Sequence, residues 1–311
     1  MQNLSVRQRI DEFVSTLPDT VSVKAYGSSV AYQSGYKENE KKQIDLIVIV
    51  EDIKKFYEKS LIKNSYMYKL IPKIYFSNAT KEQLRTGAHI CYTSNINYNN
   101  DTYKIGVIEK EDVLNDLINW DTFYIAGRMQ KEMYTVKSDE TIEKANEINK
   151  HNALVTSLLL LDKENPKLID VYKTLCSLSY MGDSRKNFKA EDPNKVLKIA
   201  NGSKDYFDKV YKDSNLFDID SEENIKINYE LLFNEIKKLP INLNNKIYEV
   251  IDLKIDNKTN LENIILVIKK YLEEIIRSSS NAQTMKGILT TGLTNSISYA
   301  HEKLKKGRKK N

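Results

Sequence analysis

Apolar positions recur with two different periods along the chain. In its first third, short runs rich in β-branched and aromatic residues predict strands, because such side chains pack well on a pleated sheet. These runs cover residues 21–26, 44–50, 88–97 and 102–108. The polar link between Tyr98 and Asp101 predicts that the last two strands form a hairpin. Amphipathic helices are predicted over 4–16 and 52–63, the second with Asp52 as its N-cap.

From residue 111 onward the apolar positions follow the helical period. The first apolar face is formed by Val113, Leu114, Leu117 and Ile118. Further helices are predicted over residues 139–161, 167–179, 194–213, 223–238 and 260–277. A strand-rich part followed by a helix-rich part indicates the α+β class. We expect a mixed-sheet domain over residues 1–135 and a smaller, helix-rich domain over residues 136–280.

Residues 281–311 form a segment of a third kind. Apolar side chains lie three or four residues apart from Met285 to Leu304, in a helical pattern softened by Gly287 and Gly292. The last eleven residues carry six basic side chains and one acidic side chain, which accounts for the whole net charge of +5. A basic run beside an apolar face favours docking of this tail on an anionic membrane surface. The alternative is a disordered basic end with nonspecific affinity for RNA.

The composition is typical of a soluble globular protein. The chain has 311 residues, of which 41% are hydrophobic and 29% charged, and no apolar run is long enough for a membrane span. Its first residues fit neither a secretory signal nor a transit peptide. Two isolated cysteines and three scattered histidines lack metal-ligand spacing. The isolated Cys91 and Cys176 predict free thiols in a reducing cytoplasm, and abundant Asn, Lys, Ile and Tyr indicate an AT-rich, bacterial genome.

A glycine-serine turn follows the first predicted strand. Gly27 can adopt backbone angles that point successive N–H groups outward, and Ser28 adds a hydroxyl donor. Such a turn suits a phosphate. By itself, however, a glycine and a serine after a strand more often form a plain turn.

Asp45 makes this turn more informative. It is the only residue of the run 44–50 that is not aliphatic, and a strand that is apolar on both faces is buried at the centre of a sheet. A carboxylate there costs several kcal/mol unless a cation or hydrogen bonds compensate it. We expect Asp45 to bind a divalent metal such as Mg²⁺; the alternative is an acid that caps a neighbouring segment or pairs with arginine.

The usual nucleotidyltransferase pattern places two acids in an Asp-x-Asp sequence, but here the second position is Ile47. A second metal ligand therefore has to come from elsewhere in the chain. Asp183, between Gly182 and Arg185, is a candidate, and its alternative is a loop acid in a local turn. Lys104 either reaches a phosphate or is a solvated lysine on an edge strand.

Three residues at helical spacing follow the hairpin. Trp120 and Tyr124 are more often core residues than site residues. Arg128, beside Gly127, is a weaker candidate for contact with an anion.

A series of short motifs spans nearly the whole chain. They are Ala25-Tyr-Gly-Ser-Ser-Val30, Gly35-Tyr36, Ile44-Asp-Leu46, Lys104-Ile-Gly-Val107, Leu117-Ile-Asn-Trp120, Tyr124 to Lys131, His151-Asn-Ala-Leu154, Leu178 to Arg185, Asn194-Lys-Val196 and Lys286 to Thr290. In these motifs the chain resembles the mitochondrial translocator assembly and maintenance proteins, peripheral CDP-diacylglycerol synthases that also have bacterial members. One departure is Ser29, where the family usually has glycine.

The resemblance implies a nucleotidyltransferase domain, a winged-helix-like domain and a membrane-associating C-terminus. It also implies a reaction of CTP with phosphatidic acid, at the inner face of the cell membrane in a bacterial member, with no nucleic acid partner. Asp45 and Asp183 would be catalytic, with Asp45 binding Mg²⁺. CTP would contact Gly27, Ser28, Ser29, Lys104 and Arg185.

Two other functions remain open. Transfer of a nucleotide to a hydroxyl of RNA, an antibiotic or a protein would call for a second carboxylate at position 47 and a general base. A non-enzymatic assembly factor could instead retain a degenerate nucleotidyltransferase fold.

Overall fold

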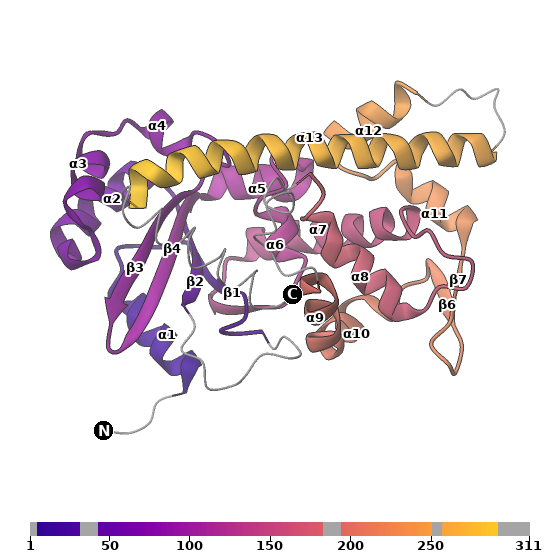
Figure 1. Cartoon of the computed structure of the whole chain (residues 1–311), viewed down its shortest axis with the longest axis horizontal. Coiled ribbons are helices and arrows are strands. Elements are labelled where there is room, and N and C mark those ends of the chain that lie inside the picture. The colour runs from indigo at the N-terminus through magenta and orange to yellow at the C-terminus, as the bar shows by residue number, and fades with distance from the viewer. Residues whose placement is uncertain (1–4, 32–42, 183–193, 251–256, 292–311) are drawn as a thin grey trace.

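The computed structural model describes residues 5–31, 43–182, 194–250 and 257–291 (Figure 1). It has the predicted α+β architecture, with one five-stranded mixed sheet and helices on both of its faces. The predicted site residues Asp183 and Arg185 lie outside the described residues, as do residues 292–311 of the predicted tail.

The sheet has the order β3-β4-β2-β1-β5. Its strands are β1 (Ser22–Tyr26), β2 (Ile44–Val50), β3 (Cys91–Tyr98), β4 (Asp101–Glu109) and β5 (Met133–Lys137). Strands β2 and β4 are parallel, and the other neighbours are antiparallel. The central position of β2 confirms the prediction made from its apolar faces. The edge strand β5 was not predicted, because its alternating polar residues are half-exposed or exposed and give only a weak strand signal.

The first face of the sheet is covered by the N-terminal helices. These are α1 (Val6–Ser15), α2 (Ile53–Lys63), the 3₁₀ helix η1 (Ser65–Met67), α3 (Leu70–Asn78) and α4 (Lys81–Arg85). They enclose an apolar core with residues such as Leu46 and Val48 of β2. The predicted cap of α2 is confirmed, since the Asp52 carboxylate accepts a hydrogen bond of 2.9 Å from the Lys55 N–H.

The second face is continuous with the helix-rich part of the chain. Its elements are α5 (Lys110–Asn119), α6 (Ala126–Met129), α7 (Glu140–Leu159), α8 (Leu168–Leu178), α9 (Lys195–Gly202), α10 (Lys204–Tyr211), β6 (Phe217–Ile219), β7 (Ile225–Ile227), α11 (Tyr229–Ile236) and α12 (Ile241–Tyr248). One apolar cluster extends from Ile47 and Ile49 of β2 into these helices.

Two helix predictions in this part were inaccurate. The helix predicted over 194–213 is divided at Ser203, and the start of the one predicted over 223–238 is the strand β7.

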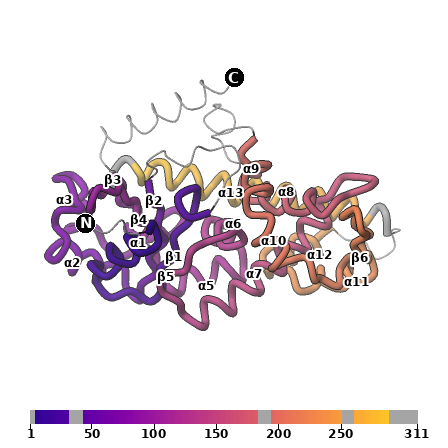
Figure 2. Tube along the Cα trace, turned by 90° about the horizontal axis from the view of Figure 1, so that it is seen from below, coloured from indigo at the N-terminus to yellow at the C-terminus, as the bar shows by residue number. Residues whose placement is uncertain are grey.

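Helix α13 (Asn257–Thr291) links the two parts of the molecule. It packs against α12 and α7, and further along against β3 and α3, as Figures 1 and 2 show. The Tyr271 hydroxyl donates to the Trp120 carbonyl at 2.8 Å, and the Gln283 side chain donates to the Ile90 carbonyl at 3.1 Å. The predicted tail therefore begins inside this helix. Among the described residues, no helix combines the length and apolar character needed to cross a bilayer.

Candidate active site

The glycine-serine turn closes the end of β1. Gly27 has a φ of +82°, in the left-handed region that favours glycine. Its carbonyl accepts hydrogen bonds from Val30 N–H at 3.1 Å and Ala31 N–H at 3.0 Å. Ser28 and Ser29 therefore stand at the start of a single helical turn, a kind of backbone conformation whose successive N–H groups can bind an anion.

Three side chains align across the sheet beside this turn. Tyr26 is the register partner of Asp45, and Asp45 is the register partner of Lys104. Register partners project from the same face, so the three lie in one row on the second face. A Cβ on Gly27 would lie 3.7 Å from an Asp45 carboxylate oxygen, which places the turn against this acid. The structure thus brings together Gly27, Asp45 and Lys104, which the sequence proposed separately.

Lys104 is held on an aromatic ring. Its amino group lies 4.2 Å from the ring centroid of Tyr92, a cation–π arrangement. The ring fits there because its register partner is Gly106, where a Cβ would come within 2.5 Å of a Tyr92 ring carbon. Because β4 is an internal strand and Lys104 is half-buried, the alternative of a solvated edge lysine is wrong.

Arg128 approaches the same row from α6. Its guanidinium carbon lies 3.8 Å from the ring centroid of Tyr124 and 5.9 Å from that of Tyr26, and Nη1 donates to the Tyr124 carbonyl. The Tyr26 and Tyr92 hydroxyls are 3.5 Å apart. We call this group the Asp45 cluster; it consists of Tyr26, Asp45, Tyr92, Lys104, Tyr124 and Arg128.

Two tyrosines of the Asp45 cluster, Tyr26 and Tyr92, stay protonated near neutral pH. Burial raises the pKa of Tyr26, and the negative charge of Asp45 raises it further. Burial also raises the pKa of Tyr92 well above its usual range, and the neighbouring Tyr124 adds to this effect. Neutral hydroxyls can donate hydrogen bonds to an anion.

Asp116, a buried acid outside the Asp45 cluster, shapes the loop that precedes α6, the helix that carries Arg128. The Asp116 carboxylate accepts five hydrogen bonds of 2.7–2.9 Å, from the N–H groups of Thr122, Phe123, Ile125 and Ala126 and from the Thr122 hydroxyl. Trp120 and Phe123 have φ values of 53° and 55° in this loop. Asp116 therefore fixes where α6 begins. Sequence reasoning missed this role, because Asp116 falls in an ordinary amphipathic helix pattern.

A second group of cations extends from Arg128 towards the helix-rich part. The Lys131 amino group donates to the Ser179 hydroxyl at 2.6 Å and lies 5.0 Å from the Tyr180 ring centroid. Lys195 lies over the same ring at 5.3 Å. We call these four residues the Lys131 cluster. Sequence reasoning did not single them out, although each lies in one of the motifs quoted above.

Charge balance distinguishes these cations from other buried cations. Lys24, on the same face of the sheet, forms an ion pair of 2.5 Å with Glu143. Within the described part of the chain, Arg128 and Lys131 have no carboxylate partner and contact tyrosines, a serine and a carbonyl. Burial lowers the pKa of Lys131, and the positive charges of Arg128 and Lys195 contribute to this shift. Bound phosphates would supply the missing negative charge.

The Asp45 carboxylate beside the Gly27 turn suits a metal ion that is also bound by nucleotide phosphates better than a metal ion bound by protein side chains alone. No group of three or more His, Cys, Asp or Glu side chains that could hold a metal occurs among the described residues. Magnesium is often bound by one or two carboxylates together with substrate phosphates, and Asp45 offers one carboxylate beside the turn. The buried Ser29 hydroxyl has no hydrogen-bond partner in the described part of the chain, so a polar ligand atom would fit there.

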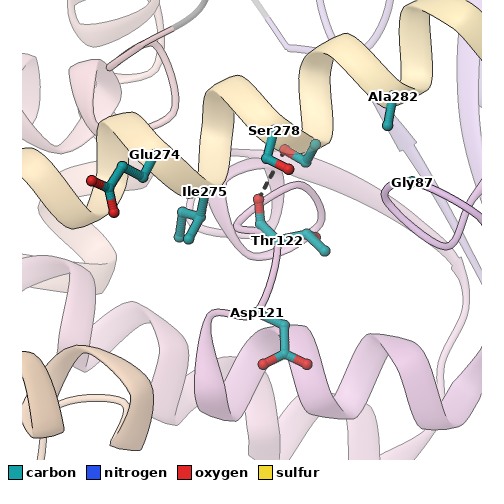
Figure 3. A pocket seen from close by; sticks show the side chains of 8 residues that line it. Gly87, Asp121, Thr122, Glu274, Ile275, Ser278 and Ala282 are labelled. Atoms are coloured by element: carbon teal, nitrogen blue, oxygen red, sulfur yellow. Dashed lines mark hydrogen bonds between the residues drawn. The ribbon is translucent and has the colours of Figure 1, made fainter.

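A cavity of about 330 Å³ elsewhere does not suit a phosphate. It lies between α13 and the loop after α5, where Ser279 donates to the Thr122 carbonyl at 3.1 Å (Figure 3). Its lining includes the acids Asp121 and Glu274 and no basic side chain. Like charges would repel a triphosphate, so the Asp45 cluster is the better candidate site.

Comparison with known proteins agrees with this assignment. The family described as "Phosphatidate cytidylyltransferase, mitochondrial" matches residues 10–306. The chain belongs to this family of nucleotidyltransferases. The curated relatives with that name include one from Schizosaccharomyces pombe, 32% identical over 91% of this chain and 79% of its own length. Others come from Dictyostelium discoideum, 29% identical over 97% and 85%, and from Xenopus laevis, 30% identical over 94% and 92%.

These relatives correct one expectation. The sequence suggested a bacterial protein at the inner face of the cell membrane. That location is wrong, because the relatives are eukaryotic proteins whose names place them in mitochondria.

Proposed function

We propose that this protein is a metal-dependent phosphatidate cytidylyltransferase that converts CTP and phosphatidic acid to CDP-diacylglycerol and pyrophosphate. The observation that carries the proposal is the row of Tyr26, Asp45 and Lys104 beside the Gly27 turn, in a chain matched by the family over residues 10–306. In this reaction a phosphatidate oxygen attacks the α-phosphorus of CTP. The bond from that phosphorus to the bridging oxygen breaks, and pyrophosphate leaves.

The chemistry requires charge neutralisation more than proton transfer. A phosphate monoester has a second pKa near 6, so at neutral pH the nucleophile is already largely dianionic. No general base is needed, unlike in transfer to a hydroxyl. Two highly charged anions must instead be brought together, and cations and oriented dipoles reduce that barrier. A site rich in lysine, arginine and tyrosine matches this need.

Each part of the site has a proposed role. The N–H groups and hydroxyls of Ser28 and Ser29 contact phosphate oxygens of CTP, and Gly27 permits the turn. Lys104 and Arg128 neutralise the triphosphate. Asp45 holds Mg²⁺, which when bound neutralises phosphate charge and polarises the α-phosphoryl group. Asp183 and Arg185 remain proposed as a second ligand and a phosphate contact.

The Lys131 cluster is proposed to hold the phosphate of phosphatidic acid. Arg128 lies only three residues before Lys131, and the Lys131 N–H donates to the Arg128 carbonyl at 3.2 Å. The cations thus form a continuous series from the Asp45 cluster to Tyr180. An acceptor phosphate at Lys131 and Lys195 would stand next to a triphosphate at Lys104 and Arg128. The basic tail, residues 281–311, would help the enzyme to reach the lipid surface.

The test is a liposome assay with the full chain. Vesicles containing phosphatidic acid are incubated with the protein, Mg²⁺ and each of CTP, ATP, GTP and UTP in turn. We expect CDP-diacylglycerol and pyrophosphate only with CTP, and loss of product when EDTA replaces Mg²⁺. Absence of product while an active cytidylyltransferase succeeds under the same conditions would overturn the proposal. Full activity in EDTA would reject the metal requirement alone.

A further inference from the structure

Exposed large apolar side chains lie on α2 and on two helices that contact it, η1 and α3. They are Ile62, Tyr66, Leu70, Ile71 and Ile74, which we call the α3 face. Ile62 is 86% exposed, Leu70 is 73% exposed, and the other three are each at least 55% exposed. Single exposed apolar side chains are ordinary, but a contiguous group of large ones marks an interaction surface.

Helix α3 is apolar on two opposite sides. Pro72 and Phe76 are buried, and the Phe76 ring stacks on Tyr57 at 3.9 Å. Leu70 and Ile74 lie one helical turn apart and point to the opposite, exposed side. Packing in the core therefore explains the apolar residues on only one side of α3. The exposed half is apolar without any packing reason within the described part of the chain.

The segment that carries the α3 face has charged side chains of one sign only. Residues 59–78 contain four lysines and no acidic residue. Lys63 and Lys69 are exposed, and Lys59 is 60% exposed, paired with Asp19 from outside this segment. Apolar side chains surrounded by lysines are the composition of segments that lie in the interface of an anionic bilayer.

We propose that the α3 face inserts into the surface of an anionic membrane. A two-fold contact with a second copy of this chain is less favourable, because an isologous interface would bring the same lysines together. The proposal rests on the proposed function in one respect: an enzyme acting on phosphatidic acid must reach a bilayer. The α3 face would be a second membrane contact, besides the predicted C-terminal tail.

The position of α13 agrees with this docking surface. Its end packs against α3 (Figure 1), and Lys286 donates to the Leu84 carbonyl at 2.5 Å and to the Thr86 carbonyl at 3.0 Å. The proposed basic tail continues directly after Thr291, the last residue of α13. Two weak membrane signals attached to one body reinforce each other more than their separate strengths suggest.

Fluorescent labelling gives a direct test, because both native cysteines, Cys91 and Cys176, are buried. An environment-sensitive dye is attached to Ile74→Cys, and in a matched control to Leu266→Cys, which replaces a 66%-exposed residue of α13. Each protein is mixed with phosphatidylcholine vesicles, with or without phosphatidylglycerol. We expect a blue shift of the dye emission at position 74 only, and only with the anionic vesicles.

A second measurement tests the energetic importance of the α3 face. Leu70→Ser/Ile74→Ser should bind anionic vesicles about tenfold more weakly than the wild type, while Leu266→Ser should not change binding. Both exchanged side chains are exposed, so the thermal unfolding temperature should stay the same. Binding is measured by co-sedimentation, which does not depend on catalysis. An inactive enzyme that still docks would therefore reject the proposed function and not this surface.

Two outcomes would overturn the proposal. One is unchanged vesicle binding by the double variant together with no spectral shift at position 74. The other is a wild-type dimer, detected by light scattering, that becomes monomeric in the double variant while vesicle binding is retained; this would make the α3 face an interface between copies.

Discussion

The two faces of the central sheet are built from alternating residues of the same strands, yet they differ in chemistry. On the first face, β2 presents Leu46 and Val48 to an apolar core. On the second face, β2 presents Ile47 and Ile49 to the helices, but Asp45 to a row of tyrosines and cations. The first face supplies stability alone. The second face forms part of the candidate site at one end and part of the apolar core at the other.

This difference shows how little the fold changes to accommodate the site. The polar row occupies one end of β2 and β4, beside the Gly27 turn, and the apolar core begins at Ile47 on β2 and at Ile108 on β4. Gly106 makes room for the Tyr92 ring at this boundary. Rigid strands position the charged groups, and the neighbouring core residues keep those strands in register.

The largest effect is expected at Asp45. Asp45→Asn keeps the shape of the side chain but removes its charge, and cytidylyl transfer should fall about 10³-fold. The control is Asp218→Asn on the exposed hairpin of β6 and β7, which should leave activity unchanged. Activity is measured at saturating CTP, and folding by circular dichroism. Activity within twofold of the wild type would remove Asp45 from the site.

The neighbouring residue on the other face should give the opposite result. Leu46 is completely buried, so Leu46→Ala should lower the free energy of unfolding by about 3 kcal/mol through lost burial and a cavity. The kcat per folded molecule should stay close to that of the wild type. Urea unfolding and active-site titration measure the two quantities. A large fall in kcat with little loss of stability would mean that the two faces are not separate in function.

A smaller effect is expected at Lys131. Lys131→Met retains an unbranched side chain but removes the charge, so the KM for phosphatidic acid should rise about tenfold, corresponding to one lost charge-assisted contact. The KM for CTP should be unchanged. The matched control is Lys238→Met, which replaces a 67%-exposed lysine. If the KM for CTP rose instead, Lys131 would belong to the nucleotide part of the site.

The smallest effect concerns an ion pair outside the Asp45 cluster, formed by His89 and Asp112. His89 Nδ1 lies 2.9 Å from Asp112, and this hydrogen bond raises the pKa of His89 above 6.5. The pair therefore stabilises the fold fully below pH 6.5, and its contribution is lost as the pH rises through the higher pKa of the folded state. Because His89 is about a third exposed, the contribution is at most about 1 kcal/mol.

His89→Asn is the suitable variant, because asparagine tolerates the φ of 58° at this position. Its unfolding free energy should decline less between pH 6 and pH 8 than that of the wild type. Cytidylyl transfer should not change. Identical pH profiles of stability for the two proteins would show that the pair contributes nothing.

Sequence patterns predicted the centre of the sheet well. The apolar run with one acid placed β2 in the middle, and the polar link predicted the β3–β4 hairpin, where Asn99 and Asn100 adopt φ values of 43° and 68°. These features depend on local rules. Lys104 was predicted only as a candidate phosphate contact, and the parallel register of β2 and β4 is what shows that it lies beside Asp45.

The rest of the site depends on contacts between distant segments. Arg128 reaches the site because Asp116 holds the loop before it, with positive φ values at two aromatic residues that sequence rules do not anticipate. Lys131 meets Ser179 across 48 residues of sequence. The exposed apolar side of α3 was also missed, because apolar periodicity alone does not distinguish buried from exposed faces.

Helix α13 has a consequence for the order in which the chain folds. Its hydrogen bonds to the Ile90 and Leu84 carbonyls connect residues 193 and 202 positions apart. During synthesis, at about 5–20 residues per second, the sheet, which is completed by β5 at Lys137, would wait roughly 7–30 s for Gln283 of this cover. A fragment that ends before Gln283 would therefore expose an unfinished first part, susceptible to aggregation. The edge of the sheet at β3 is therefore covered only after the last turns of α13 have been synthesised.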